Sequence, residues 1–200
     1  MTLPKSEPLS AQKAAEILVQ GKIAVLPTDT IYGFSAAALL RGTKSNLDIS
    51  IDKIKKSAQS KPLIELIAAP QDICKYAAQE IPQNLFEKWP GALTLLVKNN
   101  DWYKSVTGRE TTAFRCPGDQ WLRSVIELCG CPLYSTSVNV SGSAPLQDGQ
   151  EILRQFGGQI ALFVSDQKSA PSSQPPLAST LVSLLEDPPR VLRQGAVRVD

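Results

Sequence analysis

The residues best suited to chemistry are hydroxyls, amides and cations, and they gather in three short polar segments. Segment 27–33 (PTDTIYG) offers two threonines and a carboxylate, a set that binds polar ligands or forms a simple turn. Segment 55–61 (KKSAQSK) has three lysines, which suit phosphate groups but also occur in solvated loops. Segment 135–142 (STSVNVSG) has four hydroxyls and an amide, and its backbone N–H groups could form an anion nest. Together the three segments indicate a site for a polar, anionic ligand.

The amino-acid content limits the chemistry that these segments can perform. The 200 residues include no histidine, which excludes Ser-His and Cys-His nucleophiles and histidine-ligated metal sites. Of the four cysteines, only Cys129 and Cys131 are close, and their one-residue gap fits neither a zinc site nor a redox dithiol. We therefore expect free thiols and no metal held by protein ligands. The sequence also lacks the glycine-rich motifs of P-loop and dinucleotide-binding proteins.

Length and charge indicate an ordinary globular protein. Two hundred residues fit a single domain, 1–200. The net charge of +2 is too small to argue for a nucleic-acid-binding protein, although basic residues could still cluster on one face. The first residues do not resemble a signal peptide, and no apolar run reaches the length of about 18 residues that a membrane span needs. We therefore expect a cytoplasmic protein with no membrane association.

The polar segments are expected to follow strands, where ligands gather in open α/β sheets. Alternation of apolar runs and capping signals predicts an α/β fold, an open twisted mixed sheet with flanking helices. The serine- and proline-rich segment 167–177 is expected to be a loop that covers the ligand site as a lid. The predicted strands are 22–26, 63–68, 92–97, 111–116, 133–137, 160–165, 180–184 and 190–193, and the predicted helices are 11–20 (capped by Ser10), 48–56, 71–78, 84–88, 119–128 and 148–156.

Seven short motifs in a fixed order resemble the YrdC family of threonylcarbamoyl-AMP synthases. The similarity extends over about 21–197, and the motifs are PTDTIYGF, KKSAQSKPL, WPGALTLLV, AFRCPGD, STSVNVSG, STLV and VLRQGAV. The resemblance implies the family fold, with a large positively charged central cavity, in the short form that lacks the extra C-terminal domain of longer relatives. It also implies that L-threonine, bicarbonate and ATP, with Mg²⁺ on the phosphates, give threonylcarbamoyl-AMP and pyrophosphate. That product would pass to partner proteins that modify tRNA.

The same resemblance assigns roles to individual residues. By position in the motifs, Thr28, Arg115 and Ser179 match the residues that bind threonine, and Arg115 is expected to have no ion-pair partner of its own. Lys55, Ser137, Asn139 and Arg193 match the residues that bind ATP. Thr30, Tyr32 and Lys61 lie in the same motifs with less defined roles. No side chain is assigned as a nucleophile, because a carbamate attacking the α-phosphorus of ATP needs positioning and charge neutralisation instead.

One position departs from the family pattern. The family has Lys-x-Arg before Lys-Pro-Leu, and Ser57 stands here in place of the arginine. The bidentate fork that grips phosphate is therefore absent, with Lys56 or Lys53 as partial substitutes. An uncertain alignment over 34–55 also leaves open that Lys53 or Arg41 faces the phosphates. A milder departure is Val138, where relatives usually have a smaller residue.

The departure at Ser57 leaves other functions open. One alternative is a catalytically weakened YrdC-like protein that binds nucleotide or RNA, including tRNA or double-stranded RNA. Because the net charge is small, such RNA binding should be weak and dependent on salt. A further alternative is a binding module for another carboxylate and nucleotide.

Overall fold

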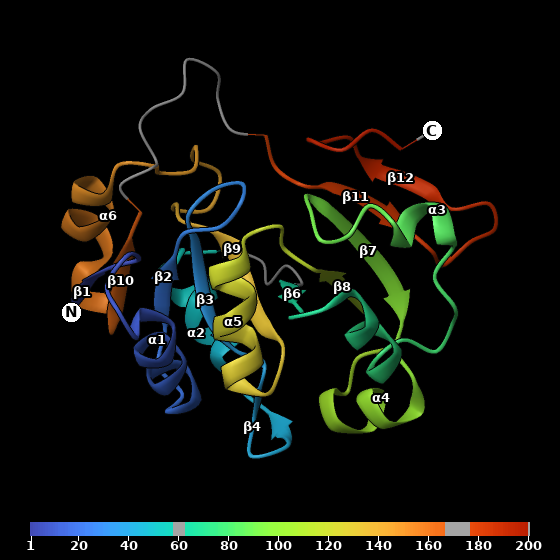
Figure 1. Ribbon diagram of the computed structural model, residues 1–200, viewed down its shortest axis with the longest axis horizontal. Helices are drawn as coiled ribbons and strands as arrows, with labels where there is room; N and C mark the ends of the chain where they lie inside the picture. Colours follow the sequence, from blue (N-terminus) through green and yellow to red (C-terminus); the bar gives the residue numbers. More distant parts are fainter. Residues whose placement is uncertain (58–62, 167–176, 200) are drawn as a thin grey trace.

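The computed structural model describes residues 1–57, 63–166 and 177–199, and these form one ten-stranded mixed sheet and a small hairpin (Figure 1). The predicted α/β class and mixed sheet are thereby confirmed. In sheet order the strands are β1 (Thr2–Pro4), β10 (Leu162–Ser165), β2 (Ala24–Leu26), β3 (Gly33–Ala37), β9 (Leu133–Ser137), β6 (Ile64–Leu66), β8 (Thr111–Arg115), β7 (Leu93–Lys98), β11 (Thr180–Ser183) and β12 (Arg190–Arg193).

The short strand β6 joins the two halves of the sheet. It pairs antiparallel with β9 on one side and parallel with β8 on the other. In Figure 1 it lies between the left-hand strands, β1 to β9 in sheet order, and the right-hand group of β8, β7, β11 and β12. Segments from both halves can therefore meet above this strand.

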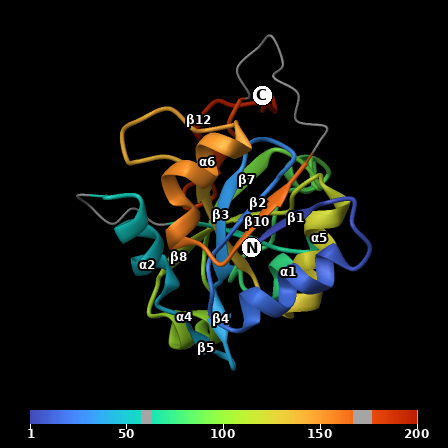
Figure 2. The ribbon, with the colours of Figure 1, turned by 90° about the vertical axis from the view of Figure 1, so that its left-hand side faces the viewer.

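Helices cover both faces of the left-hand half of the sheet (Figure 2). Helices α1 (Ser10–Val19) and α5 (Gln120–Cys129) pack against each other on one face. Helices α2 (Leu47–Ile54) and α6 (Gly149–Phe156) bury their apolar residues on the other. The remaining elements are α3 (Gln83–Phe86), α4 (Asp101–Thr107), the 3-10 turns η1 (Pro70–Lys75) and η2 (Gly157–Gln159), and the hairpin strands β4 (Leu39–Leu40) and β5 (Thr43–Lys44).

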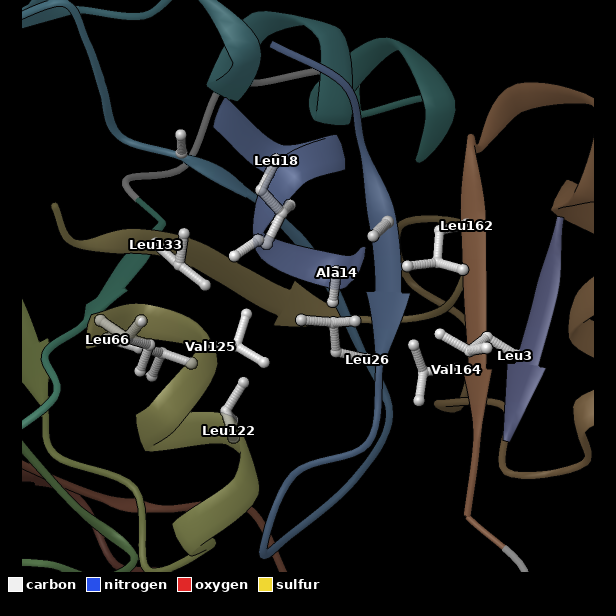
Figure 3. Packing of buried hydrophobic residues seen from close by; sticks show 14 residues of the cluster. Leu3, Ala14, Leu18, Leu26, Leu66, Leu122, Val125, Leu133, Leu162 and Val164 are labelled. Carbon is white, nitrogen blue, oxygen red and sulfur yellow. The ribbon is translucent and has the colours of Figure 1, made fainter. Parts of the chain in front are cut away.

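The face under α1 and α5 shows why these sequences form these elements. Leu18 of α1 and Val125 of α5 are fully buried, and they pack in one cluster with Leu26, Leu66 and other strand residues (Figure 3). Each fully buried aliphatic side chain contributes about 1.5–3 kcal/mol relative to its exposed state, so this cluster holds both helices onto the sheet. Among the described residues, no helix has the length and apolar character needed to cross a membrane.

Some local expectations were wrong. Strand β3 was not predicted, because its run Gly-Phe-Ser-Ala-Ala has weak strand propensity; pairing with β2 and β9 and complete burial stabilise it instead. Helix α4 was missed, and 71–78 begins as the 3-10 turn η1 rather than an α-helix.

Ser10 does not cap α1, because its hydroxyl donates to Lys5 O and accepts from the Trp121 indole. The predicted loop 167–177 lies, except for Leu177, outside the described residues.

The chain after β12 packs back onto the start of β11. The Thr180 hydroxyl accepts the backbone N–H groups of Gly195 and Val197 and donates to Val197 O. Gly195 lies so close that an added Cβ would be 2.5 Å from the carbonyl carbon of Ser179 and 2.6 Å from Thr180 N. Both neighbours are backbone atoms, so they cannot move aside without shifting β11.

We predict that Gly195→Ala separates the C-terminal segment from β11. Overpacking of this kind should lower the free energy of unfolding by about 1–3 kcal/mol. Urea unfolding measures the effect, and Gly158→Ala is the matched control, because a Cβ there meets nothing within 4 Å. Equal stabilities of the two variants would contradict the tight packing at Gly195.

Candidate active site

A cavity of about 450 Å³ lies over β6, between the two halves of the sheet. Both halves contribute to its wall. Segment 28–33 and the end of β9 come from one half, and the ends of β8 and β12 and residues 178–179 before β11 come from the other. A second hollow of about 400 Å³, between η1 and α5, is lined by none of the residues predicted from the sequence. The cavity over β6 is lined by most of them, namely Thr28, Thr30, Tyr32, Lys55, Ser57, Arg115, Ser137, Ser179 and Arg193.

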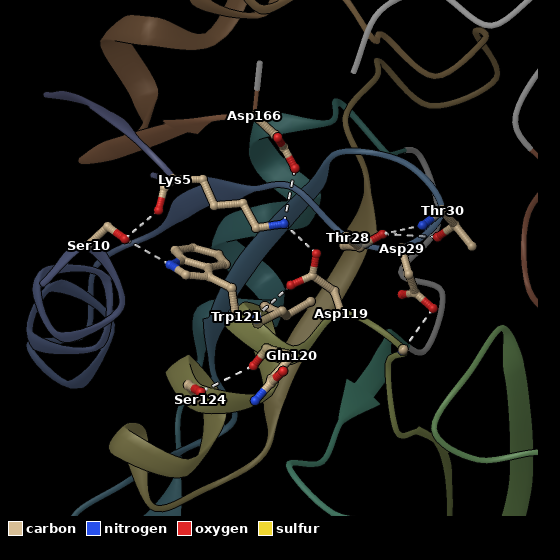
Figure 4. A network of polar contacts seen from close by, with 12 residues as sticks. Lys5, Ser10, Thr28, Asp29, Thr30, Asp119, Gln120, Trp121, Ser124 and Asp166 are labelled. Atoms are coloured by element: carbon tan, nitrogen blue, oxygen red, sulfur yellow. Dashed lines mark hydrogen bonds and ion pairs between the residues drawn. The ribbon is translucent and has the colours of Figure 1, made fainter. Parts of the chain in front are cut away.

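The turn after β2 is held by the hydroxyl of Thr28. Its Oγ1 accepts the N–H groups of Thr30 and Ile31 at 3.0 and 3.1 Å and lies 2.8 Å from Ile31 O. The hydroxyls of Thr28 and Thr30 are 3.0 Å apart (Figure 4). Thr28 therefore shapes the turn as well as lining the cavity, which combines the two interpretations that the sequence allowed.

Arg115, at the end of β8, is paired, and the expectation of an unpaired guanidinium was wrong. Its Nη2 donates to Asp29 Oδ1 at 2.7 Å, Nη1 to Thr30 Oγ1 at 3.1 Å and Nε to Gly91 O at 3.1 Å. The side chain is only 4% exposed. A buried guanidinium needs such partners because leaving it uncompensated costs several kcal/mol.

Lys55, directly after α2, organises the turn after β9. Its Nζ donates to Ser137 O at 2.5 Å, to Asn139 Oδ1 at 2.6 Å and to Asn139 O at 3.2 Å. An ammonium has three N–H donors, so these oxygens occupy all of them. Ser137 Oγ also donates to Asn139 Oδ1 at 2.7 Å. The structure thus brings three of the predicted ATP-binding residues into one cluster, with Asn139 behind the cavity wall.

Burial lowers the pKa of Lys55 to about 8, although the carboxylate of Asp52 nearby raises it in part. The ammonium also lies 5.8 Å from the centroid of the Phe34 ring. Because its donors are already used, the charged form of Lys55 would act on a ligand in the cavity through its electric field. That charge is lost as the pH rises through the pKa.

Ser179 and Arg193 meet at the opposite wall. Arg193 donates from Nε and Nη2 to Ser179 O, at 3.2 and 2.9 Å. The hydroxyl of Ser179 lies 2.8 Å from that of Thr94 in β7, and both residues are buried. A residue predicted for threonine and one predicted for ATP are therefore in direct contact.

The other predicted residues lie elsewhere or serve the fold. Tyr32 lines the cavity, but its hydroxyl accepts the N–H of Asp166 at 2.9 Å. Lys56 has a left-handed φ of 51° and an exposed side chain that does not line the cavity. Lys53 and Arg41 are likewise exposed and do not line the cavity, so neither takes the place there of the arginine that Ser57 replaces. Lys61 lies outside the described residues.

Sequence reasoning missed several contributors to the site. The carboxylate of Asp29 was noted in segment 27–33, but no role of its own was assigned to it, although it stands between the two threonines that were singled out. Thr94 lies within an apolar strand, and no local pattern marks it. Among the described residues, no group of three or more Cys, Asp or Glu is placed to hold a metal ion.

A model of the Sua5–YciO–YrdC family, described as "Telomere recombination", matches residues 16–195. The chain belongs to this family. The threonylcarbamoyl-AMP synthase of Pyrococcus abyssi is 30% identical over 193 residues, which cover 94% of this chain and 54% of the relative. The synthase of Bacillus subtilis is 29% identical over 98% of this chain and 56% of its own length. The chain thus spans about half the length of these relatives.

Solved family structures have the same fold. The structure of P. abyssi Sua5 complexed with L-threonine superposes with a TM-score of 0.80 at 28% identity, over 98% of this chain and 57% of the other. Escherichia coli YciO superposes with a TM-score of 0.79 at 21% identity and is covered over 93% of its length. The sequence resemblance to the YrdC family is therefore confirmed, whereas the roles of single residues stay predictions.

The lowered pKa of Lys55 predicts that nucleotide affinity depends on pH. Below about 8 the ammonium is charged and attracts phosphate, and above it the amine is neutral. ATP affinity should therefore fall as the pH rises from 7 to 9.5, by up to about tenfold if the loss of charge removes roughly 1.4 kcal/mol. Calorimetric titration with ATP alone avoids ionisation of the threonine amine. Lys55→Met should bind weakly at all pH values, and an unchanged pH profile in this variant would exclude Lys55 as the cause.

Proposed function

We propose that this protein makes threonylcarbamoyl-AMP and pyrophosphate from L-threonine, bicarbonate and ATP, for modification of tRNA. The observation that carries the proposal is the joint lining of one cavity by the residues predicted for threonine and those predicted for ATP. The family membership and the L-threonine complex of P. abyssi Sua5 support it.

The proposed reaction uses the groups that the cavity contains. The amine of threonine and bicarbonate form a carbamate with loss of water, and a carbamate oxygen attacks the α-phosphorus while pyrophosphate leaves. No histidine is needed, because positioning and charge neutralisation dominate such a displacement. Lys55, Arg115 and Arg193 present cations toward the cavity, with Asp52 as a carboxylate in its lining. Mg²⁺ would enter with ATP, on its phosphate oxygens.

Threonine would bind beside Arg115, and the nucleotide phosphates beside Lys55 and Arg193. The three contacts of Arg115 with the described residues leave one further N–H on Nη1 and one on Nη2. These two donors suit the two oxygens of a carboxylate. Because Ser179 and Arg193 are in contact, the two substrates would lie next to each other in this arrangement. The carbamate and the α-phosphate would then meet above β6.

A second candidate function rests on Ser57. This residue lines the cavity where the family pattern has an arginine, which favours a weakened synthase that retains binding of nucleotide or RNA. tRNA or double-stranded RNA would then be the partner.

The proposed function predicts that pyrophosphate release requires ATP, L-threonine and bicarbonate together. A coupled phosphate assay measures it, with omission of each substrate and replacement of threonine by valine as controls. Valine has the size of threonine but lacks the hydroxyl, so it tests recognition at the Ser179 wall. Nucleotide binding without release under any condition would favour the second candidate, and absence of both would contradict both functions.

Ser57→Arg should strengthen ATP binding. A charge-assisted bond to phosphate contributes roughly 1.5–3 kcal/mol, so affinity should rise about tenfold to a hundredfold. Lys56→Arg is the matched control, because its side chain lies outside the cavity. If native turnover already equals that of relatives with the arginine and Ser57→Arg changes nothing, Ser57 does not face the phosphates.

A further inference from the structure

Asp29 connects three parts of the candidate site that lie far apart in the sequence. Its Oδ1 accepts a hydrogen bond from Nη2 of Arg115 at 2.7 Å, and its Oδ2 accepts one from the N–H of Gly118 at 2.8 Å. The residue itself sits between Thr28 and Thr30, whose hydroxyls contact each other. One carboxylate therefore links the turn after β2, the end of β8 and the loop before α5.

The guanidinium of Arg115 depends on these acceptors for its orientation. Its planar fork has one partner on each nitrogen, and Asp29 is the charged one. Thr30 Oγ1 and Gly91 O are neutral acceptors, whereas the carboxylate of Asp29 adds the attraction of an opposite charge to its hydrogen bond. Without Asp29, the guanidinium could rotate toward the substrate space or toward solvent.

The loop before α5 is packed closely onto the same carboxylate. A Cβ added to Gly118 would lie 3.0 Å from Asp29 Oδ2, tighter than an ordinary contact. The neighbouring Asp119 caps α5 by accepting Leu122 N, and it also pairs with Lys5. Asp29 therefore has a fixed loop on one side and the guanidinium on the other.

We propose that Asp29 is a positioning residue that orients the guanidinium of Arg115 for the carboxylate of the amino-acid substrate, an inference that rests on the proposed function. Asp29 does not line the cavity, so it acts through Arg115. Its carboxylate also balances the buried charge of Arg115. The Arg115–Asp29 pair therefore attracts a simple inorganic anion only weakly. A ligand that accepts the remaining N–H groups and also contacts other residues of the cavity would bind more tightly.

The chain offers a matched control for testing this role. Asp72 also accepts one cation and one backbone N–H, from Lys75 Nζ at 2.7 Å and Ala69 N at 2.9 Å. Its side chain is 21% exposed, against 20% for Asp29. Asp72→Ala removes the same kinds of bond outside the cavity over β6.

Steady-state kinetics of Asp29→Ala, Asp29→Asn and Asp72→Ala test the proposal. We expect KM for threonine to rise about tenfold to a hundredfold in Asp29→Ala, as for loss of one bond to an ionised group, and by less in Asp29→Asn, whose amide oxygen still accepts a hydrogen bond. KM for ATP should stay within about threefold in both, since Lys55, Ser137 and Arg193 keep their own contacts. Asp29→Asn keeps the size of the side chain and so tests the role of the charge even if the alanine variant folds poorly. Asp72→Ala should leave both KM values unchanged. Equal changes in all parameters, or an unchanged KM for threonine in both Asp29 variants, would overturn the proposal.

A second measurement is independent of turnover. In ¹⁵N-labelled protein, the Nε–H signal of Arg115 reports whether the guanidinium is held, and Arg115→Lys identifies the signal by its loss. Its hydrogen exchange should be slow in the native protein and in Asp72→Ala, and faster by at least about tenfold in Asp29→Ala, in line with one lost bond. If the native protein releases no pyrophosphate, the proposed function fails, while this measurement still tests the orientation of Arg115. Slow exchange in both Asp29 variants would show that Asp29 does not position it.

Discussion

Two cations are buried in the wall of one cavity, and much of the surrounding structure compensates their charge. Arg115 and Lys55 are 4% and 8% exposed. A buried charge is tolerated only when acceptors surround it, and each acceptor must be held in place by its own segment. Asp29, Thr30 and Gly91 perform this task for Arg115, and the turn at 137–139 performs it for Lys55.

The two cations are compensated in different ways. Arg115 has a carboxylate partner, so its pair carries little net charge and would recognise a ligand through the direction of its remaining N–H groups. The acceptors of Lys55 are neutral oxygens, so it keeps its positive charge when protonated. The first arrangement suits a single carboxylate and the second suits polyanionic phosphates, which agrees with the two substrates proposed for the cavity.

The sheet supplies the geometry that makes this cavity. Strand β6 has only three residues, yet it pairs with β9 and β8 and joins the two halves of the sheet. The ends of longer strands on both sides therefore surround it. The helix pairs α1–α5 and α2–α6 cover the outer part of the sheet and leave the space over β6 to polar segments. Ser57 lines this cavity, so its departure from the family pattern bears on the nucleotide binding that we propose there.

The sequence alone determined the α/β class, the family and most of the segments that line the cavity. Apolar runs and caps such as Asp119 and Asp148 are local signals, and seven ordered motifs are specific even when each is weak. Only the tertiary structure decided how these residues are partnered. The Arg115–Asp29 pair spans 86 positions and the Lys55–Asn139 pair spans 84, so no local pattern could reveal them. Strand β3 depended on tertiary structure for the same reason, because its small residues form a strand only when β2 and β9 pair with both of its edges.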